Sequence, residues 1–115
     1  MEAIATALGA SLNPGAHAAL RVIQEQSPTA LKITLQALRE AQADPVLRSC
    51  LGREFRLVMR YLQRDDFLEG MRAKIIDKND NPVWQPACLE KVSAAMVGRY
   101  FSPFDDPRFE LVFLD

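Results

Sequence analysis

The segment from residue 70 to residue 84 carries the side chains best suited to hold a ligand. Lys74 and Lys78 are four residues apart, so on a helix they share one face, and Arg72 lies two residues before Lys74. A cationic face of this kind can donate charge-assisted hydrogen bonds to phosphate groups. The same pattern also describes a solvated basic helix face, and local chemistry alone favours that simpler interpretation.

A glycine and a tryptophan frame these cations. Gly70 lies inside the expected helix, where glycine costs about 1 kcal/mol relative to alanine. Close approach of another backbone would offset that cost. Residues 79–82 form a turn, and Trp84, between Pro82 and Pro86, is expected to pack back against the helix and close its exit.

The sequence offers no catalytic group with a clear role. It has no glycine-rich phosphate loop and no paired cysteine and histidine, and the single histidine, His17, has no partners with which to hold a metal. Asp65, Asp66 and Glu69 cluster at an expected helix start, where the helix dipole explains them. We therefore predict no catalytic residue, no metal site and no cofactor.

Composition narrows the class of protein. The 115 residues are 49% hydrophobic and 25% charged, which is typical of one soluble globular domain. A net charge of -1 argues against a nucleic-acid partner, which would need a clustered basic face. No apolar run reaches the roughly 20 residues that span a bilayer, so no membrane partner is expected. Cys50 and Cys88 are far apart and are expected to be reduced.

Five helix starts are predicted from capping side chains. A polar side chain precedes a proline at Asn13–Pro14, Ser27–Pro28 and Asp44–Pro45, which is the usual start of a helix. Asp66, with Glu69 three residues later, is an acidic variant of the capping box, and Ser93 is a further N-cap.

The apolar spacing between these starts is helical. One stripe advances by three or four residues at each step, through Leu47, Leu51, Phe55, Val58 and Leu62. Residues 2–9 and 93–101 predict two short helices. We therefore expect a compact all-α fold of five or six helices, with residues 1–115 as a single domain.

Three longer segments resemble one enzyme family. Residues 27–41 (SPTALKITLQALREA), 53–92 and 96–103 (MVGRYFSP) are together similar to the C-terminal region of 3-hydroxyisobutyryl-CoA hydrolases, in the crotonase (enoyl-CoA hydratase/isomerase) superfamily. The most specific part is DF-x-EG-x-RA at 66–73, then IDK at 76–78 and P-x-W-x-P at 82–86. The last two motifs point to the hydrolase branch.

This resemblance implies an enzyme of which the chain is only one part. In the family, a crotonase core supplies the oxyanion-binding amides and the acidic catalytic residues, and that core is absent from this chain. The implied partners are that missing core, an acyl-CoA substrate and further copies of the protein. The implied reaction is hydrolysis of 3-hydroxyisobutyryl-CoA in valine catabolism. Its place would be the bacterial cytoplasm or the mitochondrial matrix of a eukaryote.

One binding role carries over by resemblance. The family's lysine near the CoA phosphates corresponds to Lys78 if this branch has one extra residue before the Asp–Lys pair, and Lys74 becomes a second phosphate contact. The family's aromatic position falls on Lys74, so adenine stacking is not expected there. CoA enters as part of the substrate and not as a cofactor.

Two other functions stay open at this point. The same superfamily also hydrates or isomerises enoyl-CoA, and only the missing core distinguishes these reactions. A stand-alone helical interaction module without activity is an alternative of another class. If the chain is part of a larger enzyme, part of 28–41 or 44–63 should expose an apolar face, and the isolated chain should associate with itself.

Overall fold

The computed structural model describes residues 1–113, and helices are the only regular elements in that range. The α-helices are α1 (Glu2–Ala10), α2 (Pro14–Glu25), α3 (Pro28–Ala43), α4 (Leu47–Tyr61), α5 (Asp65–Met71) and α6 (Ala94–Phe101). A π-helix, η1 (Arg72–Ile76), continues α5, and two short 3-10 turns are η2 (Leu89–Lys91) and η3 (Pro107–Phe109). The all-α prediction is confirmed, while the last two residues of the predicted domain lie outside the described range.

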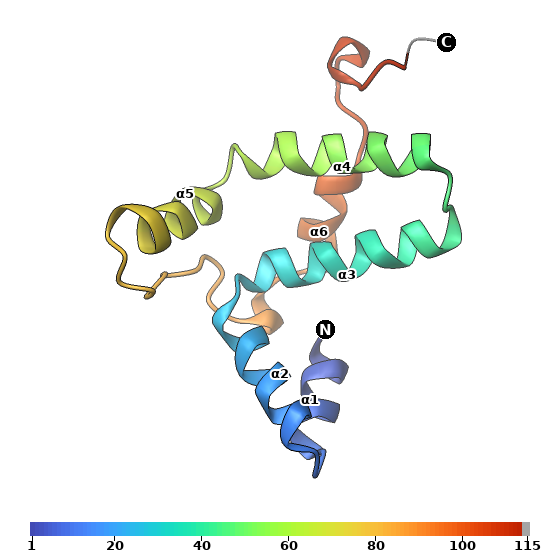
Figure 1. Ribbon diagram of the computed structural model, residues 1–115. Coiled ribbons are helices and arrows are strands. Elements are labelled where there is room, and N and C mark those ends of the chain that lie inside the picture. Colours follow the sequence, from blue (N-terminus) through green and yellow to red (C-terminus); the bar gives the residue numbers. More distant parts are fainter. Residues whose placement is uncertain (114–115) are drawn as a thin grey trace.

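The hydrophobic core lies where three helices meet. Helices α3 and α4 run antiparallel, and α6 packs against both of them (Figure 1). Helices α1 and α2 form a hairpin that projects from one end, and α5 lies beyond the end of α4. The core side chains come from α3, α4, α6 and the residue after η2: Ile33, Ala37, Leu57, Val92, Val97 and Tyr100.

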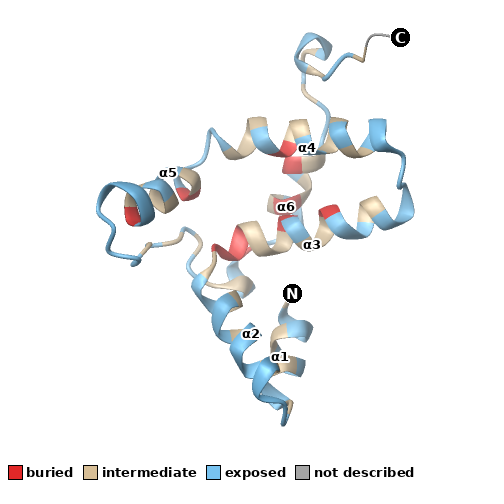
Figure 2. Cartoon of the chain, viewed as in Figure 1, coloured by how far each residue is buried: buried red, intermediate tan, exposed pale blue. Residues whose placement is uncertain are grey.

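The molecule is open, so the prediction of a compact shape was wrong. Its extents are 50 × 35 × 24 Å and its radius of gyration is 16.1 Å, against about 13 Å for a compact domain of this length. Its accessible surface is 8099 Å², against about 6300 Å² for a folded monomer of this mass. Figure 2 shows why: few residues are buried, and much of α1 and α2 and the start of α4 are exposed.

Three of the predicted caps start helices as expected. The Asn13 side chain accepts a hydrogen bond from the Gly15 amide at 2.8 Å. The Ser27 and Ser93 hydroxyls accept from the amides three residues later, each at 3.2 Å. These bonds satisfy amides that have no partner within the first helical turn.

The predicted start at Pro45 is displaced by two residues. The Asp44 amide donates to the Glu40 carbonyl at 2.8 Å, so Asp44 closes α3 and does not open the next helix. Its carboxylate accepts from the Val46 amide at 3.3 Å, and α4 begins at Leu47.

The predicted apolar stripe of α4 is largely exposed. Leu47, Leu51, Val58 and Leu62 keep between 44% and 72% of their surface accessible, whereas Leu57, at a neighbouring position, is 7% exposed and enters the core. The expected exposed apolar face is therefore present, and we call these four exposed residues the α4 stripe. None of the helices in residues 1–113 is both long and apolar enough to cross a membrane.

Candidate functional site

A buried carboxylate fixes the start of the candidate segment. Asp66 lies inside α5 and not at its N-cap, which is Arg64, so the capping-box prediction was wrong. Asp66 is 7% exposed and accepts hydrogen bonds from the Ser27 hydroxyl at 2.5 Å and the Gln85 amide at 2.9 Å. The same Ser27 hydroxyl caps α3, so these bonds join α5, α3 and the loop after η1.

A second carboxylate holds the loop against α5. Glu69 accepts two hydrogen bonds from Arg72, at 2.7 and 2.8 Å, and one from the Val83 amide at 2.7 Å. Arg72 also pairs with Asp77. The hydrogen bonds from Arg72, and then the one from Val83, lower the pKa of Glu69 to about 2, so this carboxylate stays ionised well below neutral pH.

Trp84 closes the helix as predicted, but a different contact explains Gly70. A Cβ built at Gly70 would lie 3.4 Å from the Trp84 ring, and no backbone atom lies within 4 Å of it apart from its own helix and neighbours. The ring nitrogen of Trp84 donates to the Glu25 carbonyl at 3.1 Å, which attaches the loop to the end of α2. The glycine therefore faces an aromatic ring and not another backbone.

The two lysines do not share one helical face. The Asp77 amide donates to the Arg72 carbonyl at 2.8 Å, the spacing of a π-helix, and Lys78 then adopts a φ of 51°, beyond the helix end. Lys74 lies on η1 and Lys78 in the turn that follows, and both are exposed. Neither lysine forms an ion pair within residues 1–113.

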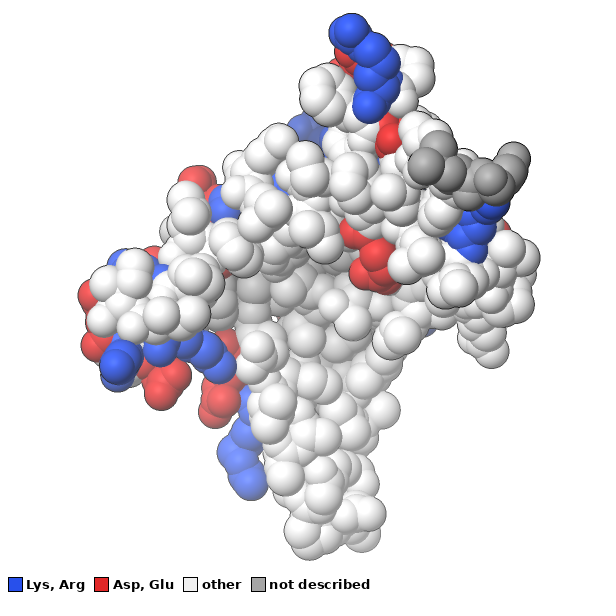
Figure 3. All heavy atoms as spheres, turned by 45° about the horizontal axis from the view of Figure 1, so that its top comes forward, with Lys and Arg blue, Asp and Glu red and all other residues white. Residues whose placement is uncertain are grey.

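The surface around the lysines is charged. Lysine, arginine and carboxylate side chains gather at the end of the molecule formed by α5 and η1, while much of the remaining surface in this view is uncharged (Figure 3). An open groove of about 550 Å³ beside α5 is lined by Asp65, Asp66, Glu69 and Arg72 among others, and by neither lysine. Both lysines therefore lie on exposed surface outside this groove.

The other polar groups named from the sequence have structural positions. His17 is exposed on α2. Cys50 and Cys88 are free thiols. Within the described residues, no three side chains of the metal-binding types come together.

Comparison with known proteins places the chain in a family. The family model described as enoyl-CoA hydratase/isomerase matches residues 1–101. The chain belongs to this family. The match extends over α1 to α6 and so includes the whole candidate segment.

Individual proteins give finer similarities. The chain is 42% identical over 92 residues to a probable 3-hydroxyisobutyryl-CoA hydrolase of Arabidopsis thaliana, covering 77% of the chain and 24% of that protein. It is 39% identical to small ribosomal subunit protein mS47 of the same plant, covering 96% of the chain and 28% of that protein. A solved enoyl-CoA hydratase from Rhodobacter sphaeroides superposes with a TM-score of 0.86 at 34% identity, covering 95% of the chain and 32% of that structure.

The chain thus spans about a quarter of the length of the curated relatives it matches. A C-terminal region of a crotonase-superfamily protein fits this partial coverage. Some relatives carry the word mitochondrial in their names.

Two features of the site were missed in the sequence. The Asp66–Ser27 bond joins residues 39 positions apart, which no local pattern can indicate. The π-helix has no compositional signature either. The one available signal was the extra residue that the resemblance required before Lys78, since a π-turn accommodates one residue more than an α-turn.

Proposed function

We propose that this chain is the helical C-terminal domain of a 3-hydroxyisobutyryl-CoA hydrolase-like enzyme, which hydrolyses an acyl-CoA thioester to a free acid and CoA. The proposal is supported by 42% identity to a protein of that name and by the Asp66–Trp84 motif. On this account residues 1–115 form one domain, the catalytic core lies in another part of the protein, and CoA enters only as part of the substrate.

Lys78, assisted by Lys74, is proposed to contact the phosphates of CoA. The observation that carries this assignment is the π-helix η1: the resemblance requires one extra residue before the Asp77–Lys78 pair, and a π-turn accommodates one residue more than an α-turn. Both ammonium groups are exposed and have no carboxylate partner in the described part of the chain, so they are available to an anionic ligand.

The domain is proposed to be inactive alone. Glu69, with its pKa near 2, is a poor proton acceptor at neutral pH, and Asp66 already accepts two hydrogen bonds that hold the fold. Neither carboxylate is free to act as a general base. The α4 stripe is proposed to be covered by the core in the full-length protein and to drive self-association of the isolated chain. Such a protein would act in the mitochondrial matrix of a eukaryote or the cytoplasm of a bacterium.

Substitution of Lys78 in the full-length enzyme tests the binding role. Loss of one charge-assisted hydrogen bond should raise KM for the CoA substrate about five- to 150-fold and leave kcat nearly unchanged, because the contact is equal in the ground and transition states. Lys74→Ala should act in the same direction but more weakly. Lys91→Ala, which removes an exposed lysine on η2, is the matched control. An unchanged KM in the Lys78 variant removes Lys78 from the site.

Two specific observations favour other functions. The superposition on an enoyl-CoA hydratase supports hydration or isomerisation of an enoyl-CoA, which would give product without thiol release. The 39% identity to a protein named as a ribosomal subunit supports a non-catalytic interaction module. In that case the full-length protein would turn over neither substrate.

A further inference from the structure

Two small pockets open on either side of Tyr100. One, of about 150 Å³, lies between α3, α5 and α6, and the other, of about 140 Å³, lies between the end of α4 and α6. Both are lined by Arg64, Arg99 and Tyr100, so they adjoin around the same three side chains. Lys74 and Lys78 line neither pocket, which separates this cleft from the proposed CoA contact.

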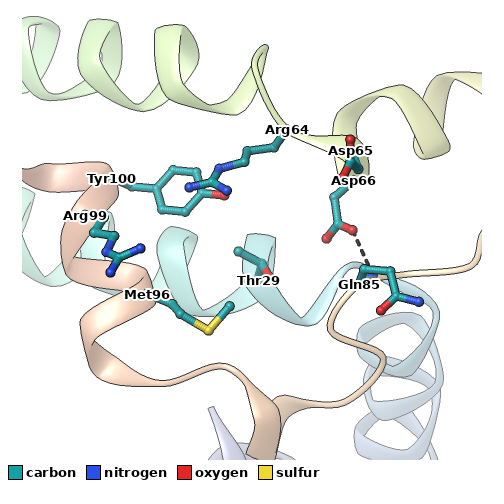
Figure 4. A pocket seen from close by; sticks show the side chains of 8 residues that line it. All are labelled: Thr29, Arg64, Asp65, Asp66, Gln85, Met96, Arg99 and Tyr100. Atoms are coloured by element: carbon teal, nitrogen blue, oxygen red, sulfur yellow. Dashed lines mark hydrogen bonds between the residues drawn. The ribbon is translucent and has the colours of Figure 1, made fainter.

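Three arginines converge on the cleft. Arg60 lines the second pocket, and Arg64 and Arg99 line both. None of the three forms an ion pair with a carboxylate in residues 1–113. Figure 4 shows the Arg64 and Arg99 guanidinium groups on the Tyr100 side of the first pocket. Like charges that line one cleft repel one another, and an anion bound between them relieves that repulsion.

Two buried polar atoms beside the cleft also have no hydrogen-bond partner in residues 1–113. The buried side-chain atoms that lack a hydrogen-bond partner, among the described residues, are Thr29 Oγ1 and Arg60 Nε. Thr29 lines the first pocket and Arg60 the second. Buried polar groups are almost always paired, so an unpaired group commonly marks a position where a ligand, an ion or water completes the bonding.

The carboxylates of the first pocket leave room for an anion. Asp65 and Asp66 lie on the wall away from Tyr100 (Figure 4). Both oxygens of Asp66 already accept hydrogen bonds, from Ser27 and Gln85. The second pocket is lined by Arg60, Gln63, Arg64, Arg99 and Tyr100, with no carboxylate among them.

We infer that this cleft binds a small oxyanion, a carboxylate or a phosphate, between Arg64 and Arg99, with Arg60 on the wall of the second pocket. Guanidinium groups match both oxyanions, because their planar donors form paired hydrogen bonds with two oxygens. A cavity of about 150 Å³ accepts a molecule the size of benzene, which is enough for inorganic phosphate or a short-chain carboxylate.

Thermal melts of this chain test the inference directly. Melts at pH 7 are compared in sodium chloride, sodium phosphate and sodium acetate at matched ionic strength. A ligand that binds only the folded state raises Tm as its concentration rises, so phosphate or acetate should raise Tm above the chloride value. A rise with phosphate alone assigns a phosphate ligand, and a rise with acetate alone assigns a carboxylate.

Two variants decide whether the effect arises in the cleft. Arg99→Gln removes an exposed guanidinium without an ion pair and should weaken the apparent affinity about tenfold or more. Arg21→Gln removes an exposed arginine on α2 and should behave as the unchanged chain. Two-dimensional NMR of the unchanged chain should show saturable shifts at the Arg99 and Tyr100 amides.

The inference is overturned if neither anion raises Tm above chloride, or if all three proteins respond equally. It is also overturned if the amide shifts spread over the whole chain and do not saturate. The assay involves no thioester and no catalytic core, so its failure leaves the proposed hydrolase function untouched.

Discussion

Between Asp65 and Trp84 the chain is held by hydrogen bonds and ion pairs, whereas α4, the helix just before this segment, is held by an apolar side chain in the core. Both regions leave several large apolar side chains exposed. The first region is held by Asp66, Glu69 and their hydrogen-bond donors. The second contributes Leu57 to the core and leaves the α4 stripe uncovered. The two regions therefore differ in what anchors them and not in whether they expose apolar surface, since Leu68, Ile75, Ile76 and Val83 are between 58% and 70% exposed.

The difference follows from what each region can satisfy locally. Hydrogen bonds and ion pairs need only a few correctly placed groups, so bonds within the α5 segment, with Ser27 and Glu25 from outside it, are enough to hold its shape. Burying an apolar stripe requires a second surface of similar size, and a chain that spans about a quarter of its relatives does not supply one within residues 1–113.

The largest effect is expected from loss of the Asp66 carboxylate. Asp66→Ala leaves the Ser27 hydroxyl and the Gln85 amide without their acceptor, which should lower the free energy of unfolding by about 3 kcal/mol. Asp66→Asn, which keeps one acceptor oxygen, should lower it less. Urea unfolding measures both variants. Equal stability of all three proteins would show that the polar anchor does not hold this region.

The second-largest effect is expected from acid, which should destabilise the α5 segment. Glu69 has an ordinary pKa of 4.5 and a folded pKa of about 2 because of its bonds to Arg72 and Val83, so the unfolded state binds a proton first. The stabilisation is therefore present above pH 4.5 and lost as the pH falls towards 2. Glu2, whose pKa Lys32 also lowers to about 2, acts in the same window.

Thermal melts of the unchanged chain and of Glu69→Gln between pH 7 and pH 2 separate the two contributions. The variant should melt lower at pH 7 and lose less stability on acidification. Parallel pH profiles for the two proteins would contradict the role of Glu69.

A smaller effect of opposite sign is expected at Gly70. The added methyl group of Gly70→Ala would meet the Trp84 ring at an ordinary contact distance, 3.4 Å, while the helix would gain up to about 1 kcal/mol from the better propensity of alanine. Urea unfolding should show an unchanged or slightly more stable protein. If the variant's free energy of unfolding fell by more than about 1 kcal/mol, the glycine would instead be explained by close packing at this position.

Charged substitutions on the α4 stripe are expected to change stability least. They should nevertheless change self-association strongly. Leu51→Glu with Val58→Lys should alter the free energy of unfolding by about 0.5 kcal/mol or less, because both side chains are already exposed. Light scattering should show association of the unchanged chain and a shift to monomer in the variant. Gln24→Glu on α2 is the control. A monomer mass for the unchanged chain across concentrations would contradict this account of the stripe.

Local sequence signals predicted the helices well, but they predicted poorly which side chains contact one another across the fold. Asn13, Ser27 and Ser93 cap helices as expected, because an N-cap bond joins residues two or three positions apart. Asp66 departed from its expected cap because the Ser27 hydroxyl, far away in the sequence, lies within reach of its carboxylate. Tertiary packing decides which groups donate to a buried carboxylate, and the spacing of nearby residues in the sequence does not predict that packing.

The candidate site shows the same division. Exposure of Lys74 and Lys78 and the packing of Trp84 follow from polarity and turn chemistry, and both are found in the structure. The shared face of the two lysines does not exist, because η1 changes the helical repeat and Lys78 falls beyond it. The convergence of Arg60, Arg64 and Arg99 was not predicted, since Arg99 comes from α6, which packs against α4 only in the folded chain.

Under the proposed function, this chain is the C-terminal part of a CoA-thioester hydrolase and has no turnover of its own. Thiol release from 3-hydroxyisobutyryl-CoA, measured for the isolated chain and for the full-length protein side by side, tests it most directly. We predict release by the full-length protein and only background hydrolysis by the isolated chain. Turnover by the isolated chain, or none by the full-length protein, would contradict the account.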